Sequence, residues 1–130
     1  MLALYRCEGR TYEGGPILKK IAILACQKAN DVCAGCGCLN AFNDRKRYFE
    51  RYSGEELRLV AFMRCSHCVD EIDPLEDPNF NEKLERLVSE GTECIHIGVC
   101  AKRDRVPCPG MSRMADAFSE KGIEIVWGTH

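Results

Sequence analysis

The feature that most constrains the fold is a regular alternation of four short apolar runs with three segments of helical periodicity. The apolar runs cover residues 21–25, 57–63, 93–99 and 123–127. The first run, Ile-Ala-Ile-Leu-Ala, is continuous, as expected for a parallel strand covered on both faces. Between the runs, apolar side chains recur at the spacing of amphipathic helices in residues 41–52, 79–90 and 112–121. This order of elements predicts a parallel α/β sheet.

We expect a three-layer, flavodoxin-like domain in which four parallel strands run in the order 2-1-3-4, joined by right-handed crossovers. A length of 130 residues suits one domain, which we assign to residues 20–130. Residues 1–19 form an N-terminal arm, whose residues 2–7 would add an edge strand. The helix at 41–52 is expected to begin after Asn40 as its N-cap and to stop at Gly54.

Composition and charge argue against nucleic acid and membranes as partners. Lys and Arg number 18 against 20 Asp and Glu, which gives a net charge of −2 and no general basic field. The apolar runs fall short of the roughly 18 residues of a membrane helix, and Arg6 and Glu8 interrupt the place of a secretory signal. The sequence therefore predicts a cytoplasmic protein.

Cysteine is the most informative residue type, because the chain has ten in a composition otherwise suited to an ordinary core. Cys26, Cys65 and Cys100 each come just after a predicted strand, and His130 follows the last one. Because parallel strands end at one edge of the sheet, we expect these side chains to converge on that rim. The other thiols expected there are Cys33, Cys36, Cys38, Cys68 and Cys108. Cys94 lies inside a strand, where a buried free cysteine is expected.

Two spacings favour metal ligation, namely Cys33-x-x-Cys36-x-Cys38 and Cys65-x-x-Cys68. A Cys-x-x-Cys pair lets both sulfurs bind one ion, and two such pairs complete a tetrahedral site. Thiolate-rich sites suit zinc and iron–sulfur clusters alike, but the cluster spacing Cys-x2-Cys-x2-Cys is not met. Zinc is therefore the expected cofactor, and an iron–sulfur cluster is the alternative.

A thiol-dependent enzyme or redox protein is the alternative function. Segment 65–68, Cys-Ser-His-Cys, has the form of a dithiol motif, although no long helix follows it and the nearby carboxylates disfavour a thiolate. On the same rim, Lys102, Arg103 and Arg105 would hold a small anionic ligand and lower thiol pKa values, or form a solvated loop. A metal-free interaction domain with reduced cysteines is the third interpretation.

The histidines have different expected roles. His96, inside a predicted strand, is expected to be a core residue bonded to a backbone carbonyl. His67 lies between two candidate thiol ligands. It would act there as a proton carrier or simply be an exposed side chain. His130 is close enough to the rim to be a ligand, since only Gly128 and Thr129 separate it from the last strand.

The combination of these motifs resembles the CGGC domain. The resemblance is carried by the run 21–26, Cys33 in a Gly-rich loop, a strand leading into a Cys-x-x-Cys segment, the segment 94–100, Pro107-Cys108-Pro109 and the closing segment 128–130. It covers roughly residues 20–130 and implies a metal site, zinc above all, without an established reaction. It carries over to Cys26, Cys33, Cys65, Cys68, His96, Cys100, Cys108 and His130. Ser66 and His67 replace the two glycines of the motif that names the family, which puts a backbone role there in doubt.

The best set of four ligands is therefore Cys26, Cys65, Cys68 and Cys100. The alternates are Cys33, Cys36, Cys38, Cys108 and His130. A site with four protein ligands would be structural, whereas one with an open position would be catalytic.

Overall fold

The computed structural model describes residues 18–130 except Val69 and Asp104. Its main sheet contains four parallel strands in the order β2-β1-β3-β6, which confirms the predicted order. The strands are β1 (Lys19–Ala25), β2 (Leu57–Arg64), β3 (Cys94–Ile97) and β6 (Glu124–Trp127). Both ends of each strand lie within three residues of the predicted ends, so the apolar runs located the strands well.

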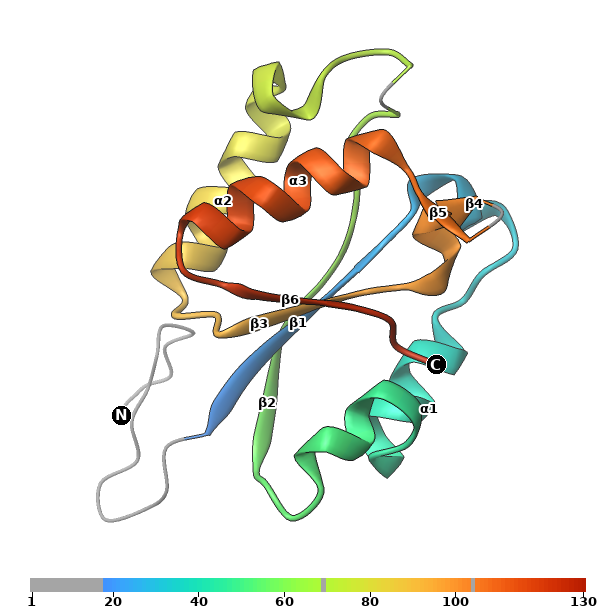
Figure 1. Ribbon diagram of the computed structural model, residues 1–130, viewed down its shortest axis with the longest axis vertical. Coiled ribbons are helices and arrows are strands. Elements are labelled where there is room, and N and C mark those ends of the chain that lie inside the picture. Colours follow the sequence, from blue (N-terminus) through green and yellow to red (C-terminus); the bar gives the residue numbers. More distant parts are fainter. Residues whose placement is uncertain (1–17, 69, 104) are drawn as a thin grey trace.

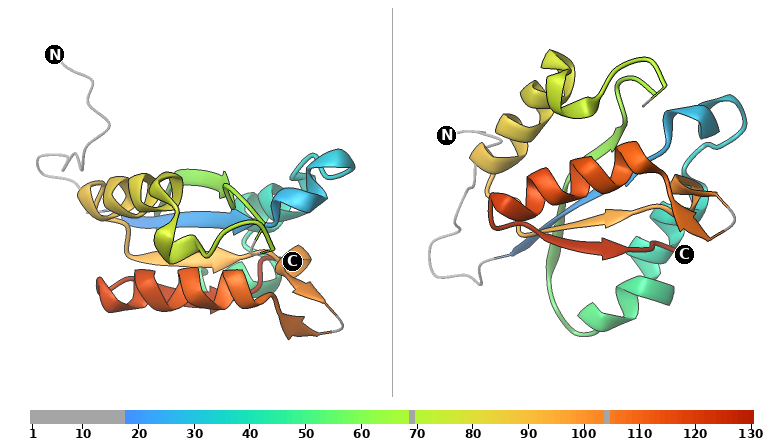
Figure 2. Two further views of the ribbon diagram at one scale, coloured as in Figure 1. Left: turned by 90° about the horizontal axis from the view of Figure 1, so that it is seen from above. Right: turned by 45° about the horizontal axis from the view of Figure 1, so that its top comes forward.

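Helices cover both faces of this sheet, as expected for a doubly wound α/β domain. One face carries α2 (Pro78–Ser89) and α3 (Pro109–Glu120), and the opposite face carries α1 (Cys36–Asp44) with the 3₁₀ segment η2 (Arg47–Tyr52) (Figure 1). The right view of Figure 2 shows the same layers from another direction. The face of the sheet that α2 and α3 cover is called the α2/α3 face below, and the opposite face is called the α1 face.

Strand β1, inside the sheet, contributes buried side chains to the hydrophobic cores on both faces of the sheet. Its side chains alternate between the two cores: Ala22 and Leu24 pack in the α2/α3 core, whereas Ile21 and Ile23 pack in the α1 core. All four are at most 1% exposed. Burying a large aliphatic side chain contributes roughly 1.5–3 kcal/mol, so this strand anchors both layers at once.

The predicted helix over residues 41–52 is wrong in its bounds. Helix α1 already begins at Cys36, after Gly35 in the left-handed conformation, and it ends at Asp44. Arg45 and Arg47 both have a φ of 56°, which interrupts the helix before η2. Asn40 consequently lies inside α1 and is not its N-cap.

Shorter segments complete the rim at the carboxyl ends of the strands. They are the 3₁₀ segments η1 (Gln27–Asp31), η3 (Pro74–Glu76) and η4 (Val99–Ala101), and a hairpin of β4 (Lys102–Arg103) and β5 (Val106–Pro107). The basic loop predicted after Cys100 contains this hairpin. The expected N-terminal edge strand lies outside the described residues. Within the part of the chain that is described, every helix falls short of the length or apolarity that a bilayer span requires.

Candidate metal centre

The carboxyl ends of β1, β2 and β3 bring three cysteines together. Cys26 follows β1 directly, Cys65 follows β2 directly, and Cys100 lies in η4 after β3. The backbone N–H of Cys26 donates to Cys100 Sγ at 3.2 Å, and the N–H of Gln27 donates to Cys65 Sγ at 3.2 Å. Residues far apart in the sequence are thus in hydrogen-bond contact at one rim of the sheet.

A narrow pocket opens at this rim on the α2/α3 face. Four cysteines and His67 line this pocket, together with the neighbouring residues that complete its wall. The full lining is Cys26, Gln27, Lys28, Cys65, His67, Cys68, Pro74, Cys108, Gly110, Met111 and Met114. The free space between these groups is large enough for a water molecule or a metal ion.

The four thiols of the pocket come from three segments, which follow β1, follow β2 and precede α3. Cys26 precedes η1, and Cys108 is the N-cap of α3, where Pro109 takes the first helical position. Cys68 lies in the loop after β2, where its N–H donates to Glu71 Oε1 at 3.1 Å. The pocket therefore forms only when the β1, β2 and α3 segments are all in place.

Electrostatics couples the thiols of this pocket. Burial raises the pKa of the Cys65 thiol, and negative charge on Cys26 or Cys108 raises it further. The Gln27 amide acts in the opposite direction because it stabilises the thiolate. An ion that supplies positive charge would relieve the repulsion between these groups.

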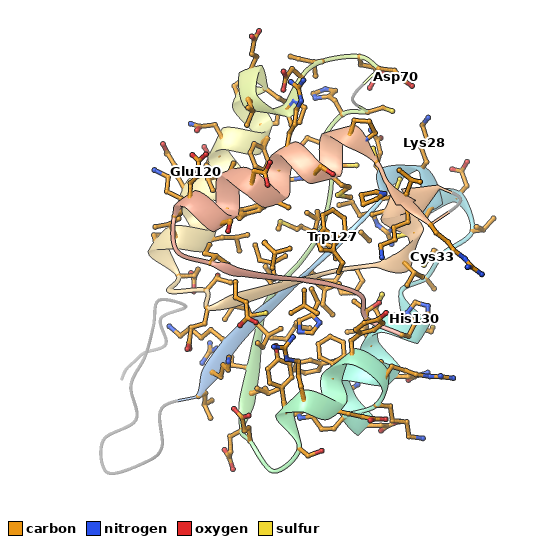
Figure 3. All side chains as sticks on the ribbon, in the orientation of Figure 1. Lys28, Cys33, Asp70, Glu120, Trp127 and His130 are labelled. Carbon is orange, nitrogen blue, oxygen red and sulfur yellow. The ribbon has the colours of Figure 1, made fainter. Side chains whose placement is uncertain are left out.

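The α1 face of the same rim carries further candidate ligands. Buried Cys38 has its sulfur 3.2 Å from Thr129 Oγ1 and 3.8 Å from His130 Nδ1. Burial raises the pKa of Cys100, and negative charge on Cys26, Cys38 or Cys33 adds to this rise. Figure 3 shows Cys33 and His130 on the same side of the molecule, near the carboxyl ends of the strands.

His96 is the core histidine that the sequence predicted. Its side chain is fully buried, with Nδ1 2.9 Å from the carbonyl oxygen of Gly128. Nε2 lies 2.7 Å from the hydroxyl of Tyr52, and Phe49 stacks on the ring at 4.2 Å. Burial lowers the pKa of His96, so the ring is neutral and both of its nitrogens are occupied. Cys94, also buried and free, has its sulfur 3.3 Å from the same Tyr52 hydroxyl.

His67 has a partner that sequence reasoning missed. Its Nδ1 lies 2.7 Å from Oδ2 of Asp77, a carboxylate that is only 3% exposed. The other carboxylate oxygen caps α2 by accepting the Asn79 N–H at 2.9 Å. The Asp-Pro pair at positions 77–78 was a signal for this cap, since proline favours the first helical position. The hydrogen bond to Asp77 raises the pKa of His67.

Other candidates lie away from the pocket. Cys36 is exposed at the start of α1. Lys102 is half-buried and Arg105 is exposed, and neither lines the pocket. Nothing in the described part of the structure supports the small anionic ligand expected at this loop.

The donor chemistry of the pocket fits a thiophilic metal, since thiolates are the ligands that zinc and iron–sulfur clusters prefer. Among the described residues, however, no group of three His, Cys, Asp or Glu side chains is arranged closely enough to hold an ion as it stands. Binding would therefore require the thiol side chains to rotate toward the ion.

The fold and the rim define a cysteine-rich α/β domain with candidate ligands at the ends of its parallel strands. The family model of the CGGC domain matches residues 20–130, so the chain belongs to the CGGC domain family. An uncharacterised protein of Methanocaldococcus jannaschii is 33% identical over 118 residues, covering 85% of this chain and 86% of the relative. No solved structure matches this chain. The cysteines gathered at the rim of this chain agree with a metal-binding domain.

Proposed function

We propose that this protein binds a transition-metal ion, zinc, through thiolates of the pocket on the α2/α3 face. The four ligands are Cys26, Cys65, Cys68 and Cys108. The observation that carries the proposal is that these four cysteines, from three separate segments, line one pocket. Chance does not readily gather four thiols in this way, and tetrahedral thiolate coordination is a common zinc site.

The proposed set differs from the sequence-based one at one position. Cys108 takes the place of Cys100, because Cys108 lines the pocket and Cys100 does not. Cys108 reaches the pocket as the N-cap of α3, and its position depends on how α3 docks against the sheet. With four protein ligands the site would be structural, with no open coordination position for a substrate.

Burial of the thiols favours this function over a free cysteine nucleophile. A nucleophilic cysteine needs a lowered pKa, whereas burial raises the pKa of both Cys65 and Cys100. A bound metal overcomes that cost, because it binds the thiolate and displaces the proton. The Gln27 N–H that points at Cys65 Sγ would then be the outer hydrogen bond that orients this ligand.

Zinc competition tests the proposal. The reduced, metal-free protein is titrated with zinc against a chromophoric chelator, beside the variants Cys68→Ser and Cys36→Ser. Loss of the Cys68 ligand should weaken the pocket's zinc affinity by more than about 100-fold, beyond what removing an outer hydrogen bond typically costs. Cys36 is the matched control because it is exposed and does not line the pocket. Equal zinc binding by Cys68→Ser and the unchanged protein would rule the pocket out, and visible absorption in the purified protein would indicate an iron–sulfur cluster.

A further inference from the structure

Cys100 is a rim cysteine that the proposed zinc pocket leaves unused. It does not line the pocket, yet its sulfur accepts the hydrogen bond from the backbone N–H of Cys26 at 3.2 Å. Burial raises the pKa of Cys100, and negative charge on Cys26 raises it further. A cysteine of the pocket and a cysteine outside it are therefore neighbours, at the ends of the adjacent strands β1 and β3.

A glycine lets the Cys100 sulfur turn back toward β1. A Cβ atom built on Gly98 would lie 3.3 Å from Cys100 Sγ and 3.8 Å from the carbonyl oxygen of Leu24. Gly98 is itself joined to β1, because its N–H donates to the same Leu24 carbonyl at 2.9 Å. The sulfur thus lies beside the last residues of β1, with no side chain at position 98 to hold it away from Cys26.

Cys26 has another thiol neighbour, on the β2 side. The N–H of Gln27 donates to Cys65 Sγ at 3.2 Å, and β2 and β3 flank β1 in the sheet. Burial raises the pKa of Cys65, and negative charge on Cys26 adds to this rise. Cys65 lines the pocket and Cys100 does not. The Cys26 sulfur can share an ion with Cys65 or form a covalent bond with Cys100, but it cannot do both at once.

The contact between Cys26 and Cys100 brings the pair within reach of a disulfide. Because the Cys26 N–H touches Cys100 Sγ, that sulfur lies within about 4.7 Å of the Cys26 Cα. A disulfide joins residues whose Cα atoms are roughly 4.4–6.8 Å apart. Cys26 lies between β1 and η1, and Cys100 lies in the short segment η4, so neither is held inside a strand or an α-helix. Rotation of the two side chains and a small adjustment of η4 would therefore close the bond.

We propose that Cys26 and Cys100 form a reversible disulfide, and that this bond withdraws Cys26 from the pocket and releases zinc. The pair would then be a modification site that makes zinc binding depend on the redox state of the protein. The effect on zinc rests on the proposed function, whereas the disulfide itself does not.

The oxidant is the disulfide of a small thiol. Cys26, which lines the open pocket, loses its proton and attacks one sulfur of the oxidant, which forms a mixed disulfide and releases one small thiol. The Cys100 thiolate then attacks the Cys26 sulfur, closes the protein disulfide and releases the second small thiol. Two electrons and two protons pass from the protein to the two small thiols, and an excess of small thiol reverses the reaction.

Peptide mapping tests the pairing. The reduced, metal-free protein is treated anaerobically with glutathione disulfide, the remaining thiols are alkylated, and linked peptides are identified by mass spectrometry without reduction. We expect a link between the peptides of Cys26 and Cys100 that dithiothreitol removes. Cys100→Ser should stop at the mixed disulfide on Cys26. Cys36→Ser is the matched control, because Cys36 is exposed and lies outside the pocket, and it should leave the link unchanged.

Zinc titration of the oxidised and the reduced protein tests the consequence. Oxidation should weaken zinc binding by more than about 100-fold, because a ligand is lost rather than an outer hydrogen bond. A link from Cys26 to Cys65, a link that leaves out Cys100, or no link at all would overturn the pairing, and this map requires no variant to fold. A link between Cys26 and Cys100 that leaves zinc affinity unchanged would overturn the release of zinc. If the reduced protein binds no zinc, the proposed function fails, and the map still decides whether the disulfide forms.

Discussion

Replacing Tyr52 by phenylalanine should destabilise the protein by leaving a buried nitrogen without its donor. The Tyr52 side chain is 2% exposed, and its hydroxyl lies 2.7 Å from His96 Nε2. Because Nδ1 of the neutral ring donates to the Gly128 carbonyl, Nε2 must accept, and the Tyr52 hydroxyl is its donor. Phenylalanine keeps the ring and its packing against Phe49 but removes this hydrogen bond, together with the 3.3 Å contact between the hydroxyl and Cys94 Sγ.

The expected loss is about 1–3 kcal/mol, the cost of leaving a buried acceptor unsatisfied. For a domain of this size it corresponds to a fall in unfolding temperature of roughly 4–12 °C. Urea unfolding of the metal-free protein, followed by circular dichroism, measures it. Tyr48→Phe is the matched control, because Tyr48 is 46% exposed. A loss below about 0.5 kcal/mol for Tyr52→Phe would refute the assigned hydrogen bond and ring tautomer.

Three further outcomes follow from the same structure. Because burial lowers the pKa of His96, the unfolded chain takes up a proton that the folded chain does not, so the free energy of unfolding should fall as the pH drops through about 6.5. The midpoints of urea unfolding, measured at several pH values, should depend less on pH in His96→Gln than in the unchanged protein. An equal pH dependence in the two proteins would contradict this origin. Phe118→Ala, at a side chain 1% exposed and packed edge-on against Phe80, should cost about 3–5 kcal/mol in urea unfolding, and a loss under 1 kcal/mol would mean that the α2/α3 core is packed differently. Asp77→Ala removes the N-cap of α2 and the hydrogen-bond partner of His67, so it should lower the unfolding temperature more than Asp116→Ala, on the exposed face of α3, does. Equal unfolding temperatures for the two variants would argue against the cap.

The layering of the fold could be predicted from the sequence because it depends on local patterns. The continuous run in β1 indicated a strand buried on both faces, and Ile21 to Ala25 are indeed buried there. The alternation of strands with amphipathic segments then predicted a parallel sheet with right-handed crossovers. The flavodoxin-like strand order that we expected for such a sheet is the observed one. The bounds of α1 could not be predicted, because its break depends on the positive φ values of Arg45 and Arg47, which no local residue preference requires.

The candidate site was predictable only in part. The position of Cys26 and Cys65 after strands placed them at the rim, because every parallel strand ends there. The separation of the thiols between two faces was not predictable. It depends on how α1 carries Cys38 to Thr129 and on how α3 carries Cys108 to the pocket, and both are matters of tertiary packing.

The most direct test of the central claim is to map which thiols zinc protects. The reduced protein is treated briefly with an alkylating reagent, with and without zinc, and the modified positions are read by mass spectrometry. Zinc should slow the modification of Cys26, Cys65, Cys68 and Cys108 together, while exposed Cys36 continues to react. Modification rates at these four positions that do not change with zinc would contradict the account.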